Sequence, residues 1–174
     1  ARADAIAHAT ARVITEKMEE DPAFYAKFSK LIQQAIEDFR ARRISDLEYL
    51  HKAVEYRDKI VTRRHDDMPA ALNGNEEAMA YYGVLKPFFD QQNLPQKKRE
   101  CITADTALAV QKILELNWKV QFWDDDDAKN RAIDNIDDYL IDEVKIKHGL
   151  DISFEQIDDI ITRVMKVAES RSHK

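Results

Sequence analysis

Apolar residues recur along this chain at the three- and four-residue spacing that is typical of helices with one buried face. The clearest stripe follows Asp21-Pro22 and consists of Phe24, Phe28, Leu31, Ile32, Ala35 and Phe39. Similar stripes predict other helices, among them one over about 3–20 and one over about 96–117. No segment has a convincing strand pattern. The spacing therefore predicts an all-α fold, an irregular bundle of six to seven helices.

Capping signals mark where several of these helices begin. Asp21 offers a carboxylate to the first turn of a helix, and Pro22 suits the first helical position. The stretches Ser45-Asp46-Leu47-Glu48 and Ser153-Phe154-Glu155-Gln156 both match a capping box. On its inner face, the helix after Ser45 is expected to bury Leu47, Leu50, Val54 and Val61.

The connections between the predicted helices indicate how the chain is organised. A short link at residues 42–44 makes the second and third helices antiparallel neighbours, which predicts a long N-terminal helical hairpin. A C-terminal helical group follows, and proline-containing turns place a soft division between the two near residues 86–96. The whole chain, 1–174, is interpreted as one helical domain. Because the sequence begins with Ala1 rather than Met, next to a predicted helix, we expect a fragment of a longer protein, and processing of a tag is the alternative.

The composition narrows the class of protein. The chain has only 3 Gly and 4 Pro, whereas sheet proteins need frequent turns that use these residues. A single cysteine, Cys101, excludes a disulfide within the chain and fits a reducing, cytoplasmic location. No apolar run approaches the roughly 20 residues that cross a bilayer, so no membrane partner is expected.

The charge is unevenly distributed. The net charge is −6, and all of the excess negative charge lies beyond residue 100. Such acidity argues against non-specific nucleic-acid binding, which needs a dominant positive field. Basic groups near predicted helix ends leave two interpretations open: compensation of the helix dipole, which we favour, or contact with DNA phosphates. The candidates for DNA contact are Arg40, Arg42, Arg43, Arg57, Arg63, Arg64, Lys97, Lys98 and Arg99.

Residue types that carry catalysis are present, but not in catalytic patterns. The glycines, Gly74, Gly83 and Gly149, are too far apart for a phosphate-binding loop. No two histidines lie at the helical spacing of a zinc pair, and His65 is interpreted as loop surface. The run Asp124–Asp127 is interpreted as a solvated helix start. We therefore predict no catalytic residue, no metal site, no cofactor and no enzyme activity for this chain alone.

Three aromatic residues, Trp118, Phe122 and Trp123, follow the predicted helix that ends near residue 117. We interpret them as a corner of the hydrophobic core. The alternative is that Trp118 and Trp123 form part of a protein interface, because an exposed tryptophan at a helix end can anchor a partner.

Three stretches give the chain a resemblance to a known family: MEEDPAFYAKFSKLIQQAI at 18–36, LNGNEEAMAYYGVL at 72–85, and FWDDDDAKNRAIDNIDDYL at 122–140. In this order they resemble the C-terminal helical region of the motor (R) subunit of type I restriction enzymes. The resemblance implies a parent subunit with upstream nuclease and translocase domains. That parent would use ATP and Mg²⁺ to translocate and cleave unmodified DNA.

The resemblance also implies partners for this region: the methyltransferase and specificity subunits, the remainder of the motor subunit, and duplex DNA. No catalytic residue of the family falls in it. Asn73-Gly74-Asn75 becomes a candidate protein interface, although the residues alone predict only a turn, and both interpretations stay open. We expect a domain that docks the motor on the methyltransferase core, with an auxiliary DNA contact. The alternative is a brace that touches only its own motor subunit.

Overall fold

A computed structural model describes residues 2–173, and every regular element in that range is helical. These residues contain seven α-helices and no strand, which confirms the predicted all-α bundle of six to seven helices. The chain divides into two compact units, the first ending at Asp67 and the second beginning at Met68, and each has its own hydrophobic core. None of the described helices combines the length and the apolar character needed to cross a membrane.

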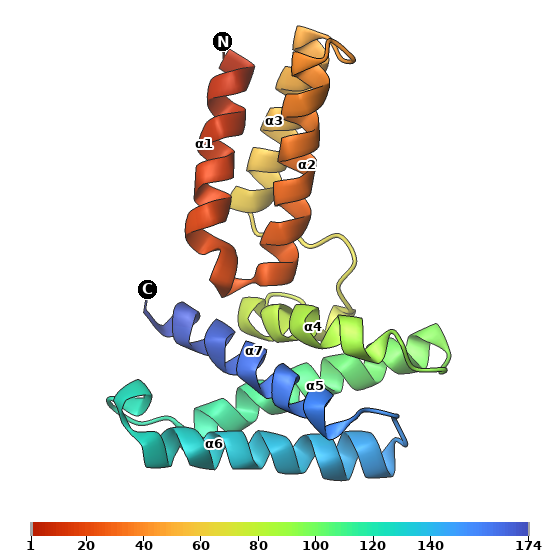
Figure 1. Ribbon diagram of the computed structural model, residues 1–174, viewed down its shortest axis with the longest axis vertical. Helices are drawn as coiled ribbons and strands as arrows, with labels where there is room; N and C mark the ends of the chain where they lie inside the picture. Colours follow the sequence, from red (N-terminus) through yellow and green to blue (C-terminus); the bar gives the residue numbers. More distant parts are fainter. Residues whose placement is uncertain (1, 174) are drawn as a thin grey trace. The chain divides into compact units, whose positions relative to one another are not determined.

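Three helices form the first unit: α1 (Arg2–Lys17), α2 (Pro22–Arg40) and α3 (Asp46–Val61). Each packs against the other two, so that one core runs along the middle of the unit (Figure 1). The ring of Phe39 stacks on that of Tyr49 with centroids 4.3 Å apart, which joins α2 to α3. The largest members of this core are Ile14, Phe24, Tyr25, Phe28, Ile32, Tyr49 and Ile60.

The antiparallel hairpin of α2 and α3 follows from the residues at its ends. Asp21 Oδ1 accepts a hydrogen bond from the Phe24 amide at 3.3 Å and so caps α2, as predicted. At the turn, Arg42 adopts a left-handed φ of 57°. Ser45 then caps α3 by accepting a hydrogen bond from the Glu48 amide at 3.1 Å. These local interactions confirm the predicted hairpin and fix where each helix begins.

The buried face of α3 is not the predicted one. Leu47 and Val61 are exposed, with relative accessible areas of 62% and 74%, and Tyr49 and Ile60 are buried in their place. Both sets of residues have the spacing of one helix face, so the sequence pattern alone does not show which face of α3 is buried. The face with tyrosines is buried because an aromatic ring removes more apolar area from water. Tyr49 also donates a hydrogen bond to Asp4 of α1 at 2.9 Å.

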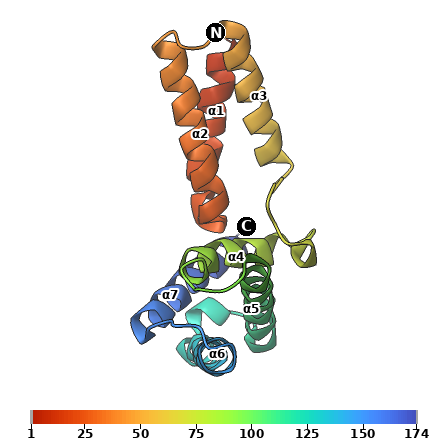
Figure 2. The ribbon, with the colours of Figure 1, turned by 90° about the vertical axis from the view of Figure 1, so that its right-hand side faces the viewer.

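Four helices form the second unit: α4 (Glu76–Phe89), α5 (Gln96–Asn117), α6 (Asp126–Tyr139) and α7 (Phe154–Ser172). α4 packs against α5 and α7, and both of these helices pack against α6. Figure 2 accordingly shows α5 and α7 between α4 and α6. α4 is the most completely buried of the four, because most of its residues after its first turn lie in the core.

Three shorter segments complete the second unit. Ala70–Leu72 and Phe122–Asp124 are single 3-10 turns, and Leu140–Lys147 continues α6 as a π-helical segment. Gly149 ends this segment with a φ of 68°, a conformation that favours glycine. The chain then enters α7 through Ser153, whose side chain and that of Gln156 form the predicted capping box.

The boundary between the two units lies well before the division predicted near residues 86–96. Pro87 stands in the last turn of α4, which continues to Phe89. α4 and α5 contribute to the same core, and Leu94 in the turn between them packs against it. Prolines here mark the end of a helix rather than the end of a unit. The boundary falls instead in the irregular segment between α3 and Ala70, whose sequence has no helical stripe of apolar residues.

One carboxylate of α6 is expected to lower the stability of the second unit. The pKa of Asp137 is raised, chiefly because partial burial disfavours its charge, and further by repulsion from Asp138, Asp158 and Asp134. A raised pKa in the folded state means that stability falls as pH rises through the ordinary pKa of the carboxyl group. Asp137→Asn should therefore raise the melting temperature at pH 7. The difference should vanish near about pH 3, below the ordinary pKa, and a difference independent of pH would contradict this account.

Candidate functional site

The basic residues proposed for DNA contact do not gather in one place. The turn between α2 and α3 carries Arg40, Arg42 and Arg43. Toward the other end of α3 lie Arg57, Arg63 and Arg64. Because α3 has 16 residues, about 24 Å of helix separates its two ends. The first turn of α5, in the second unit, carries Lys97, Lys98 and Arg99. The first unit therefore has two separate basic groups rather than one basic surface.

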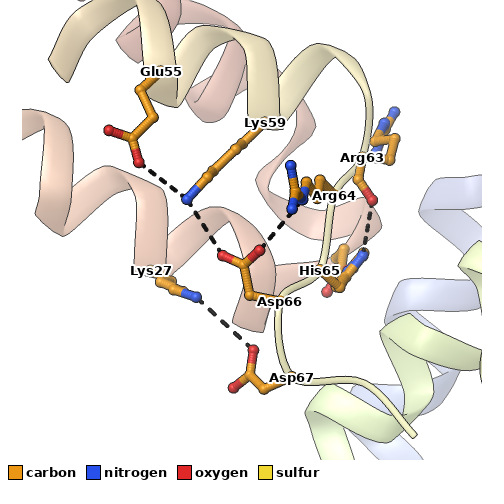
Figure 3. Close-up of polar contacts among 9 residues, drawn as sticks. Lys27, Glu55, Lys59, Arg63, Arg64, His65, Asp66 and Asp67 are labelled. Atoms are coloured by element: carbon orange, nitrogen blue, oxygen red, sulfur yellow. Dashed lines mark hydrogen bonds and ion pairs between the residues drawn. The ribbon is translucent and has the colours of Figure 1, made fainter. Parts of the chain in front are cut away.

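The C-terminal end of α3 carries a network of opposite charges, which Figure 3 shows in detail. Lys59 Nζ lies 3.1 Å from Glu55 Oε1 and 3.4 Å from Asp66 Oδ2. The hydrogen bond with Glu55 is the main reason why the pKa of Lys59 is raised. The other oxygen of Asp66 lies 3.6 Å from Arg64 Nε. One carboxylate thus serves two cations, and neither cation is left to attract a phosphate by itself.

The other cations near this end are neutralised in a similar way. Lys27 of α2 lies 4.0 Å from Asp67, and Arg57 lies 3.1 Å from its neighbour Asp58. Surface ion pairs of this kind contribute about 1 kcal/mol or less to stability. These pairs also bear on DNA recognition, because a DNA phosphate would have to displace the carboxylate that already lies beside the cation.

Arg63 holds the first unit together and does not present its charge to solvent. Its side chain is 16% exposed and lies 3.6 Å from Glu20, whose side chain is 15% exposed. The guanidinium also lies over the ring of Tyr25, 5.4 Å from the ring centroid. A left-handed φ of 54° turns the backbone at Arg63 away from the axis of α3. Arg63 thereby joins the end of α3 to the turn between α1 and α2.

His65 lies in the loop after α3, as predicted, but its side chain is largely buried and does not lie on the surface. Its side chain is 8% exposed, and Nε2 lies 3.0 Å from Oδ2 of Asp21, whose side chain is 5% exposed. Nδ1 lies 3.0 Å from the backbone oxygen of Arg63 (Figure 3), and the ring packs 4.5 Å from that of Phe24. Both ring nitrogens therefore lie within hydrogen-bonding distance of an oxygen atom. Sequence spacing could not reveal this pair, because 44 positions separate its members.

The remaining candidates for DNA contact lie at the turn between α2 and α3 and in the first turn of α5. Arg43 pairs with Asp38 at 3.1 Å, and Arg99 lies 3.8 Å from Asp90. The positive end of the helix dipole lies at the start of α5, so dipole compensation does not explain the lysines there. The candidates that are exposed and lie outside these pairs are Arg40, Arg42, Lys97 and Lys98.

The Asn73-Gly74-Asn75 turn is tied into the second unit by its last residue. Gly74 has a φ of 75°, which favours glycine, and Asn73 is exposed beside it. Asn75 Oδ1 caps α4 by accepting a hydrogen bond from the Ala78 amide at 3.1 Å. The side-chain amides of Asn75 and Gln111 of α5 exchange hydrogen bonds of 2.7 and 3.0 Å. Asn75 therefore has a structural role, and Asn73 and Gly74 are the members of the turn that are open to a partner.

The aromatic residues after α5 divide between core and surface. Phe122 is buried and Trp123 half-buried, with rings at 90° and centroids 4.9 Å apart, as a core corner requires. Trp118 stacks on Phe122 at 5.2 Å but stays 53% exposed. Leu116 and Val120 on either side of it are 73% and 85% exposed. We term Leu116, Trp118 and Val120 the apolar strip. In the sequence, apolar and polar residues alternate from Leu116 to Val120. This alternation differs from the helical spacing before it and is the signal by which the apolar strip could have been found.

No three side chains of His, Cys, Asp or Glu in residues 2–173 come together in a way that could hold a metal ion. Comparisons with protein-family models, with curated proteins and with solved structures find no match for this chain. The features of this chain that bear on function are the apolar strip, the charge network at the end of α3, and the three stretches that carry the resemblance.

Proposed function

We propose that this chain is a non-catalytic assembly domain that docks a motor subunit on a partner protein. The apolar strip carries the proposal, because three neighbouring apolar side chains remain largely in water beside a well-packed core. Exposed apolar surface of this kind marks protein interfaces. The resemblance to the C-terminal region of type I restriction motor subunits supports the methyltransferase core as the partner in this proposal. The whole complex would then translocate and cleave DNA with ATP and Mg²⁺ bound elsewhere in the motor subunit.

The distribution of charge favours a protein partner over DNA. The first unit has equal numbers of acidic and basic residues, so the second unit carries the entire net charge of −6. DNA affinity comes mainly from cations that neutralise phosphates, and most cations at the end of α3 already face carboxylates. Contact with DNA is accordingly an auxiliary role in this proposal. It falls to the exposed cations Arg40, Arg42, Lys97 and Lys98.

The proposal is tested by making the apolar strip acidic. The double variant Leu116→Asp/Val120→Asp should weaken binding to the methyltransferase core by about 30-fold or more, the effect of losing about 2 kcal/mol at an interface centre. The measurement is a titration of the chain against the purified core. The matched control is Leu47→Asp/Val61→Asp, which alters the same two residue types at exposed positions of α3 and should leave the affinity unchanged.

A brace within the motor subunit is the second candidate. The separation of the basic groups at the two ends of α3 favours it, because a brace needs no convergent basic surface. It predicts that neither double variant changes binding to the methyltransferase core. That result would overturn the docking proposal and leave the brace as the account of this chain.

A further inference from the structure

A groove of about 470 Å³ lies beside the apolar strip in the second unit. Its volume falls in the range of small-molecule and side-chain pockets, about 300–1,000 Å³. In Figure 1, the N-terminal end of α4 and the C-terminal ends of α5 and α7 lie on the same side of the second unit, and these ends carry residues that line the groove. Its walls are formed by Glu77, Leu114, Glu115, Trp118, Phe122, Trp123, Ala168, Arg171 and Ser172.

One wall of the groove is aromatic. Trp118 and Phe122 stack with an interplanar angle of 28°, and Trp123 stands edge-on to Phe122 at 90°. Because Trp118 is 53% exposed, part of its indole remains open to a ligand. The exposed face of an indole is the best aromatic surface for a cation within about 6 Å. Leu114 and Ala168 supply buried apolar surface beside it, which suits an aliphatic stem.

The charged residues of the groove make it negative. Both oxygens of Glu77 are occupied, one by the Tyr81 hydroxyl at 2.7 Å and the other by Gln111 at 3.0 Å. The guanidinium of Arg171 lies 3.8 Å from Glu76, and its side chain is 15% exposed. Burial raises the pKa of Tyr81, and the nearby charge of Glu77 raises it further. The Tyr81 hydroxyl therefore stays protonated and donates its hydrogen bond to Glu77.

Glu115 is the carboxylate of this groove that is available to a ligand. It is exposed, and among residues 2–173 it forms no hydrogen bond or ion pair through its side chain. It stands three residues before Trp118 at the end of α5, so carboxylate and indole border the same groove. A planar cation on an aliphatic stem matches this combination, because it can stack on the indole while it pairs with the carboxylate. An anionic ligand would meet two carboxylates, and Arg171, which also lines the groove, is only 15% exposed and lies 3.8 Å from Glu76.

We propose that the groove binds an arginine side chain presented by a partner protein. The guanidinium stacks on Trp118 and donates to Glu115, and the methylene stem lies against Leu114 and Ala168. Arginine fits better than lysine because its planar, weakly hydrated guanidinium can stack and form two parallel hydrogen bonds. The inference deepens the proposed docking function, since it adds a specific anchor beside the apolar strip. It can be tested without knowledge of the partner.

The test uses the two indole N–H signals of the chain in a ¹H–¹⁵N NMR spectrum, because both tryptophans border the groove. The probes are acetyl-arginine-amide and acetyl-citrulline-amide, which share a shape but differ in charge. We expect saturable shifts with the arginine probe and at least tenfold weaker binding of the citrulline probe. Glu115→Gln should weaken arginine binding about tenfold, whereas Glu100→Gln, near the other end of α5, should leave it unchanged.

Equal binding of the two probes, or undiminished arginine binding by Glu115→Gln, would overturn the arginine site. Such a result is distinguishable from a failure of the docking proposal, which the Leu116→Asp/Val120→Asp variant tests with the methyltransferase core. The dispersion of the remaining amide signals shows in the same spectra that each variant is folded. An arginine-selective shift that depends on Glu115 would establish the site even if the core proves to bind elsewhere.

Discussion

Replacement of Asp21 with alanine is expected to destabilise the first unit by about 2–4 kcal/mol, while the second unit keeps its stability. One oxygen of this buried carboxylate caps α2, and the other lies 3.0 Å from His65. The loss of a helix cap costs about 1 kcal/mol. The larger part of the effect comes from His65, because its largely buried Nε2 would lose its hydrogen-bond partner, which costs about 1–3 kcal/mol.

The two units can be followed separately in one unfolding experiment. Both tryptophans belong to the second unit, so fluorescence reports on that unit, whereas circular dichroism reports on all helices. In urea, Asp21→Ala should shift part of the dichroism transition to lower denaturant and leave the fluorescence transition in place. Asp67→Ala is the control, because that side chain is 80% exposed and lies 4.0 Å from Lys27, and it should shift neither transition. Equal effects of the two variants would contradict the role assigned to Asp21.

Replacement of Trp118 with alanine is expected to weaken binding to the methyltransferase core by about 30-fold or more. Trp118 lies at the centre of the apolar strip and stacks on the buried ring of Phe122, so it is both rigid and exposed. Rigid aromatic residues with these properties dominate the energetics of protein interfaces. The fold should survive the change, because about half of the side chain is already in water.

The control for Trp118→Ala is Phe154→Ala. Phe154 is 64% exposed at the start of α7, so its removal alters a comparable aromatic surface elsewhere in the second unit. Isothermal titration of each variant with the core measures the difference directly. A loss of affinity for both variants, or for neither, would show that the apolar strip is not the docking surface.

Local features of this fold were predictable from the sequence. Asp21 and Ser45 cap their helices as expected, and Ser153 with Gln156 forms the expected capping box, because each interaction joins residues within three positions. The face of α3 was not predictable in the same way. Two helical stripes compete there, and the contact between Tyr49 and Asp4, 45 positions apart, selects one of them.

The candidate site was predictable only in part, for the same reason. The arginines near the end of α3 were visible as a basic group, but the carboxylate that holds Arg63 comes from Glu20 in another part of the first unit. The burial of the His65 side chain was not predictable either, because its partner, Asp21, lies 44 positions away in the sequence. Trp118 and Trp123 are visible in the sequence as a pair, yet packing around Phe122 determines that Trp118 is exposed whereas Trp123 is half-buried.

A salt titration with two ligands tests most directly whether this chain docks on a protein and contacts DNA only in an auxiliary role. The chain is titrated in parallel with duplex DNA and with the methyltransferase core, from low to physiological ionic strength. We predict binding to the core that changes little with salt, and negligible affinity for DNA at physiological salt. DNA binding that falls with a log–log slope of several units, about 0.9 for each phosphate contacted, would contradict the account. It would mean that the basic groups act together on DNA despite the carboxylates that surround them.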